Sequence, residues 1–170
     1  MIVECEQSHP LENKQIGGVT FNFTYKPDRI DRLHDGTVRI VDYKTGSDKT
    51  NFADVRDLFE QVNASSKRCK AILQLFLYCY AYLHEYGTEG RVMPVIYKLS
   101  SMQESGVEQK GHGQYVFSMD DDVAQSFVMR MGETVKRLYE QDFDQADEGA
   151  KECNYCRFID FCRRTPRKND

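Results

Sequence analysis

A short turn with glycine at its end joins two segments of the chain. They cover residues 28–33 and 37–44, with His34-Asp35-Gly36 between them. Such a three-residue turn between two strand-like segments predicts an antiparallel β-hairpin, because glycine readily adopts the left-handed conformation that the turn needs. The hairpin determines which of its side chains share a face of the sheet.

The predicted register brings two acidic side chains together. With this turn, Asp31 lies opposite Arg39 and Asp28 lies opposite Asp42. Directly opposed side chains share a face, and two like charges there destabilise the sheet unless a cation neutralises them. Asp31 pairs with Arg39, so we expect a structural role for it. A two-residue turn would shift the register by one residue and separate Asp28 from Asp42.

The second strand carries an Asp-x-Lys pattern at Asp42 and Lys44. Strand side chains alternate, so Lys44 shares the face of Asp42 and Tyr43 points away. Asp28, Asp42 and the backbone carbonyl of Tyr43 are oxygen ligands suited to magnesium, and the nearby ammonium can position a water and balance phosphate charge. This pattern indicates phosphodiester hydrolysis. A lone Asp-x-Lys is also commonly a surface ion pair worth about 0–1 kcal/mol.

A long apolar segment predicts a helix over residues 66–86, buried because residues 71–83 are apolar almost all round. Lys67, Lys70, Gln74 and Tyr78 are spaced so that they form one polar stripe on it. A polar stripe on a buried helix must face polar groups. We expect Gln74 and Tyr78 to hydrogen-bond a catalytic carboxylate, a water or a DNA phosphate. The alternative is that they are two polar residues of the core whose hydrogen bonds are satisfied there.

The rest of the chain predicts a mixture of strands and helices. Residues 1–18 read as a strand fragment plus a loop with little chemistry, and residues 100–113 as a flexible surface loop. Pro94 places the strand over residues 92–99 near an edge or a bulge. The other predicted elements are strands over residues 19–25 and 114–118 and helices over residues 52–61 and 120–139.

Three motifs in this order resemble the RecB/AddB-type nuclease domain of the PD-(D/E)XK superfamily. They are Asp28-Arg29-Ile30-Asp31, Ile40-Val41-Asp42-Tyr43-Lys44-Thr45-Gly46 and Gln74-x-x-x-Tyr78. The resemblance implies an α/β fold with a restriction-endonuclease-like core, a central mixed sheet flanked by helices. It also implies Mg²⁺- or Mn²⁺-dependent cleavage of DNA, with Asp28, Asp42, Lys44, Gln74 and Tyr78 as the catalytic residues.

The same resemblance implies a biological setting. It suggests an exonuclease of bacterial recombination and double-strand-break repair, with DNA and a helicase subunit or helicase domain as partners. The alternative is a non-catalytic scaffold of the same fold that binds DNA or the helicase.

Two features depart from the family pattern. Tyr25 stands where the family usually has glycine, three residues before the first aspartate. The family also begins with a helix that carries a histidine or glutamate, whereas His9 and Glu4 lie in a segment that does not look helical, so neither is assigned that role. We therefore expect the chain to be a fragment from the C-terminal end of a longer protein, and the isolated piece to have reduced activity or none.

Three cysteines, Cys153, Cys156 and Cys162, crowd near the C-terminus at a spacing that suits zinc or an iron-sulfur cluster. They resemble the C-terminal triplet of AddB-type and CRISPR-adaptation nucleases, in which a cysteine of the early helix completes an iron-sulfur cluster. Cys5 is too close to the first motif to match that position, so it is expected to be free. The cluster would be incomplete in this chain, and zinc or unligated thiols remain alternatives.

Composition limits the functions further. The chain has 170 residues, a net charge of -4 and a pI near 5.6, so it has no global positive field and any DNA contact must be local. No apolar run reaches the roughly 20 residues that span a bilayer, and we expect a cytoplasmic protein without membrane partners. We predict a nuclease core over residues 1–150 and a cysteine-bearing basic tail over residues 151–170. Cys69 and Cys79 are expected to be buried thiols in the core.

Overall fold

The computed structural model describes residues 1–16, 18–60, 69–140, 153 and 156–162. The chain divides into two compact units, Met1–Lys136 and Arg137–Asp170. The predicted boundary after residue 150 falls outside the described residues and stays a prediction. No helix of the described part is long and apolar enough to cross a membrane.

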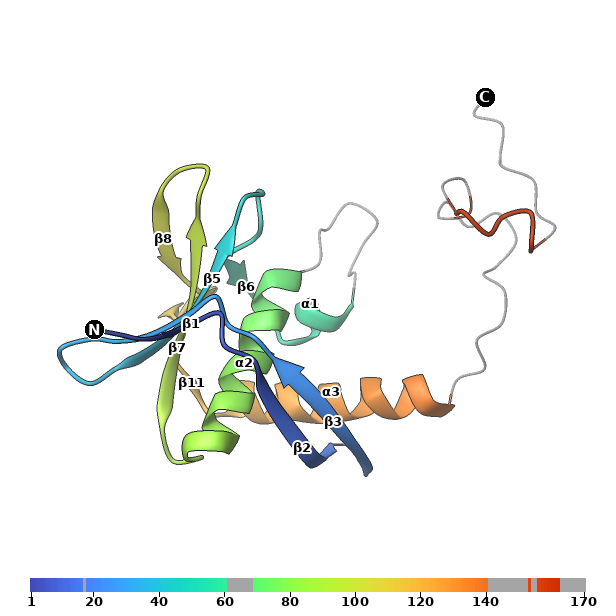
Figure 1. Ribbon diagram of the computed structural model, residues 1–170, viewed down its shortest axis with the longest axis horizontal. Helices are drawn as coiled ribbons and strands as arrows, with labels where there is room; N and C mark the ends of the chain where they lie inside the picture. Colours follow the sequence, from blue (N-terminus) through green and yellow to red (C-terminus); the bar gives the residue numbers. More distant parts are fainter. Residues whose placement is uncertain (17, 61–68, 141–152, 154–155, 163–170) are drawn as a thin grey trace. The chain divides into compact units, whose positions relative to one another are not determined.

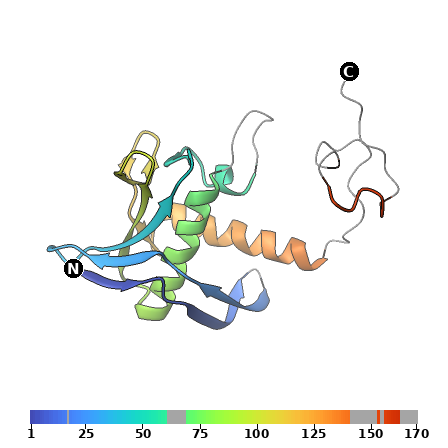
Figure 2. The same ribbon diagram turned by 45° about the horizontal axis from the view of Figure 1, so that its top comes forward.

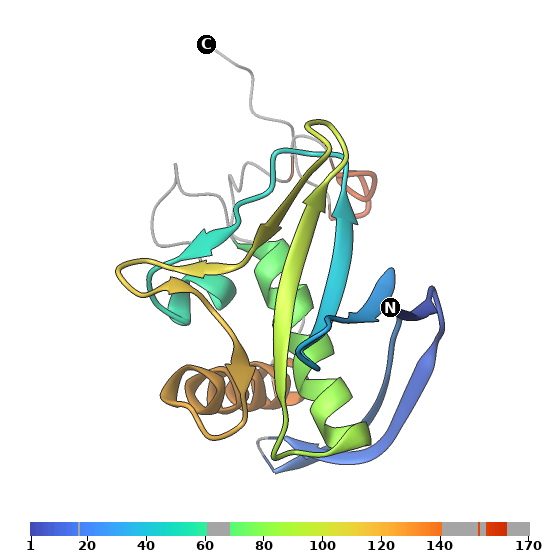
Figure 3. The same ribbon diagram turned by 90° about the vertical axis from the view of Figure 1, so that its left-hand side faces the viewer.

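A mixed β-sheet forms the centre of the first unit (Figure 1). Its strands β5 (Val38–Lys44) and β7 (Arg91–Lys98) run parallel in the middle, side by side in Figure 3. On one side, β4 (Arg29–Arg32) pairs with β5, and β1 (Ile2–Cys5) pairs with β4. On the other side, β8 (Gln103–Gly106) and β11 (Phe117–Ser118) both pair with β7. All four of these pairings are antiparallel.

Two smaller sheets accompany the central one. Strands β2 (His9–Ile16) and β3 (Val19–Tyr25) form an antiparallel ribbon. Strands β6 (Asn51–Phe52), β9 (Glu108–Gln109) and β10 (Gly113–Gln114) form the other. The helices of the described residues are α1 (Arg56–Phe59), α2 (Lys70–Tyr86) and α3 (Asp122–Glu140).

The core lies between the central sheet and α2, which covers one face of the sheet in all three views (Figures 1–3). Ile40 and Ile96 of the sheet and Leu75 and Phe76 of α2 are fully buried. Aromatic rings around Phe76, with centroids 5.0–5.6 Å away, join α2 to the start of α3 and to the small sheet. The predicted α/β class with a central mixed sheet and helices against it is confirmed.

The predicted hairpin register is confirmed. Asp31 pairs with Arg39 and Arg29 with Val41, and continuing this ladder by one residue brings Asp28 opposite Asp42. Gly36 has φ +90°, and its backbone N–H donates to the carbonyl of Leu33, which closes the three-residue turn. The left-handed glycine is what sets this register.

Five predicted elements differ from the structure. The strand predicted over residues 114–118 is two short strands, β10 and β11, in different sheets. Residues 1–16 form β1 and β2 rather than a strand fragment and a loop, and residues 100–113 include β8 and β9 rather than a flexible loop. The segment predicted as a helix over residues 52–61 forms only the short α1, preceded by β6 at Asn51–Phe52. The strand predicted near an edge, β7, is central. Pro94 is tolerated there because it falls between the residues paired with β11 and those paired with β8.

Candidate active site

Asp28 precedes β4 directly and turns its carboxylate toward the neighbouring strand. Its Oδ2 accepts a hydrogen bond from the backbone N–H of Tyr43, at 2.6 Å. This contact ties Asp28 to the residue that follows Asp42, where the paired register of β4 and β5 has just ended. The two aspartates therefore lie next to each other at the end of the hairpin, as the register predicts.

Asp42 is buried, with 3% of its surface exposed. Its Oδ2 lies 2.7 Å from Lys44 Nζ, close enough for an ion pair, but this oxygen accepts no hydrogen bond of good geometry from the described residues. Burial raises the pKa of the Asp42 carboxyl; Lys44 opposes this rise, and the nearby carboxylates of Asp28 and Asp48 add to it. The site therefore holds a desolvated carboxylate with an unused lone pair and an excess of negative charge around it.

A polar relay connects Lys44 to the helix. Lys44 Nζ donates to Gln74 Oε1 at 2.9 Å, and Gln74 Nε2 donates to the hydroxyl of Tyr78 at 2.8 Å. Gln74 and Tyr78 are one helical turn apart on the face of α2 that packs on the sheet. The polar stripe thus faces the Asp-x-Lys motif. Of its two lysines, Lys70 is exposed at the start of α2, and Lys67 lies outside the described residues.

Tyr43 points to the other face of the sheet, as predicted. Its hydroxyl accepts a hydrogen bond from Arg29, and its ring lies beside Tyr97, with centroids 5.5 Å apart. Arg39 makes two hydrogen bonds to Asp31 on that same face, at 2.6 and 2.8 Å. These contacts are consistent with the structural role predicted for Asp31. The sheet therefore has one face that carries ion pairs and an opposite face that carries Asp42 and Lys44.

The site lies where the central parallel strands end. Lys44 is the last residue of β5, and it pairs with Lys98, the last residue of β7. Ligands of open α/β sheets commonly bind outside the carboxyl ends of parallel strands. Lys44 and Lys98 thus place two cationic side chains at the edge of the sheet that also holds the carboxylates.

The residues present suit a hard divalent cation. The buried Oδ2 of Asp42 accepts no hydrogen bond of good geometry from the described residues, and a second carboxylate, Asp28, lies beside it. Oxygen ligands of this kind are those that magnesium takes, with waters completing the shell. The described residues hold no cluster of three or more histidine, cysteine or acidic side chains suited to a metal, so a cation here would be held by two carboxylates.

The terminal cysteines lie in the second unit. Cys153, Cys156 and Cys162 are free thiols, and Cys156 Sγ accepts a hydrogen bond from the backbone N–H of Phe158, at 3.4 Å. The three are not grouped as a metal site among the described residues. Cys5 is free and exposed, and Cys69 and Cys79 are buried, as predicted.

The sequence pattern did not predict a polar cluster at the C-terminal end of α2. His9, expected to carry little chemistry, is buried between Glu4 of β1 and Glu85 of α2, and Tyr25 of β3 donates to Glu85. The cluster depends on the β2–β3 ribbon, which the irregular pattern of residues 1–18 did not predict. Its only sequence signal is a histidine within an otherwise polar N-terminal segment.

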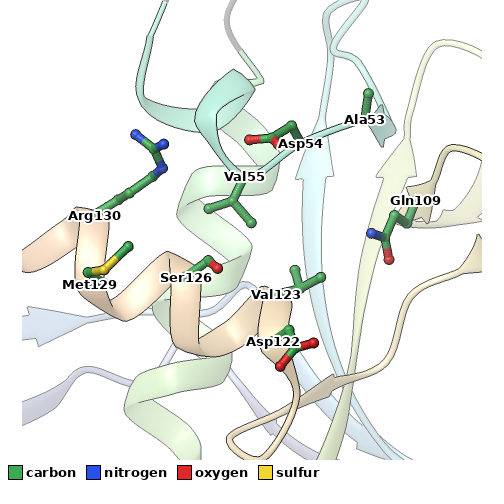
Figure 4. Close-up of a pocket in the computed structure, with 9 residues that line it drawn as sticks. All are labelled: Ala53, Asp54, Val55, Gln109, Asp122, Val123, Ser126, Met129 and Arg130. Atoms are coloured by element: carbon green, nitrogen blue, oxygen red, sulfur yellow. The ribbon is translucent and has the colours of Figure 1, made fainter.

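A pocket of about 250 Å³ lies elsewhere in the first unit, between the segment before α1, strand β9 and the first half of α3 (Figure 4). Asp54, Gln109, Asp122 and Arg130 supply its charged and polar lining. None of the predicted site residues lines it. The Asp28–Asp42 site is thus distinct from this hollow.

The chain matches the model of a known protein family. Residues 2–163 match the family model described as "PD-(D/E)XK nuclease superfamily". No curated protein matches the chain. A solved structure described as "Crystal structure of SSO0001" is 16% identical, with a TM-score of 0.44. The match covers 94% of this chain and 59% of that one, so the chain spans less than two thirds of its length.

Proposed function

Because the chain belongs to the PD-(D/E)XK nuclease superfamily, we propose that it hydrolyses phosphodiester bonds of DNA with a divalent cation, Mg²⁺ or Mn²⁺, held by Asp28 and Asp42. The observation that supports this proposal best is the burial of the Asp42 carboxylate beside a second carboxylate, Asp28, with one ammonium, that of Lys44, against them. Neighbouring carboxylates of which one is buried are costly unless further positive charge balances them. The carbonyl of Tyr43 is the third proposed oxygen ligand.

The side chains around the carboxylates have separate roles in the proposed reaction. The bound cation supplies Lewis acidity and positive charge against the scissile phosphate. The ammonium of Lys44 orients the attacking water and offsets the charge that develops on the phosphate oxygens. Gln74 holds that ammonium through its Oε1, at 2.9 Å, and Tyr78 in turn holds the amide of Gln74. The pair positions Lys44 rather than reacting.

We further propose that the protein is an exonuclease of bacterial recombination and double-strand-break repair that works with a helicase subunit or helicase domain. This assignment depends on the resemblance of the three motifs to RecB/AddB-type nucleases. The iron-sulfur cluster on Cys153, Cys156 and Cys162 belongs to the same proposal. Iron and acid-labile sulfide in anaerobically purified protein would support it, whereas zinc alone, or no metal, would contradict it.

Cleavage of matched DNA substrates tests the proposed activity. The full chain is incubated with end-labelled linear DNA and with closed circular DNA of the same sequence, with and without Mg²⁺ or Mn²⁺. We expect cation-dependent shortening of the linear DNA while the circle stays intact. Nicking of the circle would mean an endonuclease. DNA binding without cleavage under any of these conditions would favour the non-catalytic scaffold.

A further inference from the structure

His9 has a carboxylate at each of its ring nitrogens. Nε2 lies 2.7 Å from Glu4 Oε1, and Nδ1 lies 3.3 Å from Glu85 Oε1. The imidazole is 7% exposed, so water does not replace either partner readily. With a carboxylate at each nitrogen, the ring is held from two sides.

Tyr25 is fixed by the same cluster. Its hydroxyl donates to Glu85 Oε2 at 2.5 Å, and its ring stacks on that of His9, with centroids 4.8 Å apart. The phenol is 1% exposed, and burial together with the Glu85 carboxylate raises the pKa of Tyr25, which stays a neutral donor. The other group that faces His9 is the ring of Tyr86, 6.5 Å away. We call His9, Glu4, Glu85 and Tyr25 the histidine clamp.

The clamp touches the active site at two points. The ring of Tyr25 packs against that of Tyr78, with centroids 6.1 Å apart, and Tyr78 accepts the hydrogen bond from Gln74. Tyr25 also ends β3 three residues before Asp28, and the buried Pro27 stiffens the link between them. One clamped side chain thus borders both the Lys44 relay and the segment that carries the first carboxylate.

We propose that His9 is a positioning residue whose clamp on Tyr25 sets the placement of Tyr78, Gln74 and Asp28. Loss of either ring contact of His9 removes one side of the clamp, and Tyr25 and the relay then lose part of their order. The inference rests on the proposed nuclease function for its catalytic consequence, but the coupling from His9 to Gln74 does not require cleavage.

The side-chain amide of Gln74 reports on this coupling without any catalysis. Its signals in a ¹H–¹⁵N correlation spectrum, assigned by their loss in Gln74→Leu, are followed in the metal-free full chain. We expect them to shift in Tyr25→Phe and in His9→Gln, and to stay in place in Tyr139→Phe, a matched change at an exposed tyrosine. Unshifted Gln74 signals in both clamp variants would overturn the proposal.

Kinetics then test the catalytic consequence. With DNA and saturating Mg²⁺, Tyr25→Phe should lower kcat by about tenfold while KM stays within about twofold, because the site is misplaced rather than unable to bind. An unchanged kcat would overturn the positioning role. If the wild type cleaves no DNA, the nuclease proposal fails, and the Gln74 spectra still decide whether the clamp is coupled to the relay.

Discussion

Asp42 Oδ2 lies 2.7 Å from Lys44 Nζ and still accepts no hydrogen bond of good geometry from the described residues. The same ammonium donates to Gln74 Oε1. Lys44 therefore supplies one positive charge to the buried carboxylate, whose oxygens still have lone pairs for a further ligand. A site that combines an available anionic oxygen with an adjacent fixed cation suits the binding of a metal and a phosphate together.

Removing the charge of Lys44 should abolish most of the cleavage. Lys44→Met keeps the apolar stem and loses the ammonium, and we expect kcat to fall by about 10²–10³-fold, the usual loss for one electrostatic group at a reacting phosphate or carbonyl. Lys110→Ala, which removes an exposed lysine, serves as the control. Wild-type turnover in Lys44→Met, measured on the same labelled DNA, would contradict the role of Lys44.

Divalent cations should stabilise the folded protein through the two aspartates. A ligand that binds only the folded state raises its stability by mass action, so Mg²⁺ or Mn²⁺ should raise the Tm of the wild type. Asp42→Asn and Asp28→Asn should lose this rise, whereas Glu108→Gln, an exposed carboxylate on β9, should keep it. Thermal unfolding at a series of cation concentrations measures the effect. An equal rise in all four proteins would mean that the cation binds elsewhere.

Gln74 should affect turnover more than Tyr78 does. Gln74→Leu removes the acceptor of the Lys44 ammonium, and we expect kcat to fall about tenfold with little change in KM. Tyr78→Phe leaves that acceptor in place and should cost less. Steady-state kinetics of both variants, with Tyr139→Phe as the exposed control, tests the order. A larger loss in Tyr78→Phe would show that the tyrosine contacts the substrate itself.

The Asp31–Arg39 pair should make stability depend on acid pH. Burial raises the pKa of Asp31, but the hydrogen bonds and charge of Arg39, together with Arg29, outweigh burial and hold it below its ordinary value. The carboxyl therefore adds stability above its unfolded pKa, and that stability is lost as the pH falls through the lowered folded value. Asp31→Asn should be less stable at neutral pH by about 2 kcal/mol and lose less stability on acidification. Urea unfolding at several pH values measures both, and parallel curves for the two proteins would contradict the assignment.

The local pattern determined the hairpin and its consequences. A three-residue turn with a glycine at its end placed Asp28 near Asp42, and helical spacing put Gln74 and Tyr78 on one face of α2. These relations are fixed by neighbours close in the chain, so the sequence alone carries them. The three motifs also gave the superfamily, which the match over residues 2–163 confirms.

Only the tertiary structure decided the central position of β7 and the contacts of His9. Pro94 argued for an edge, yet β7 pairs with β11 before the proline and with β8 after it, and with β5 along its other side. His9 meets Glu85 across 76 residues through a ribbon whose register has a bulge. Such contacts depend on how separate elements pack, and neither local periodicity nor turn chemistry specifies that packing.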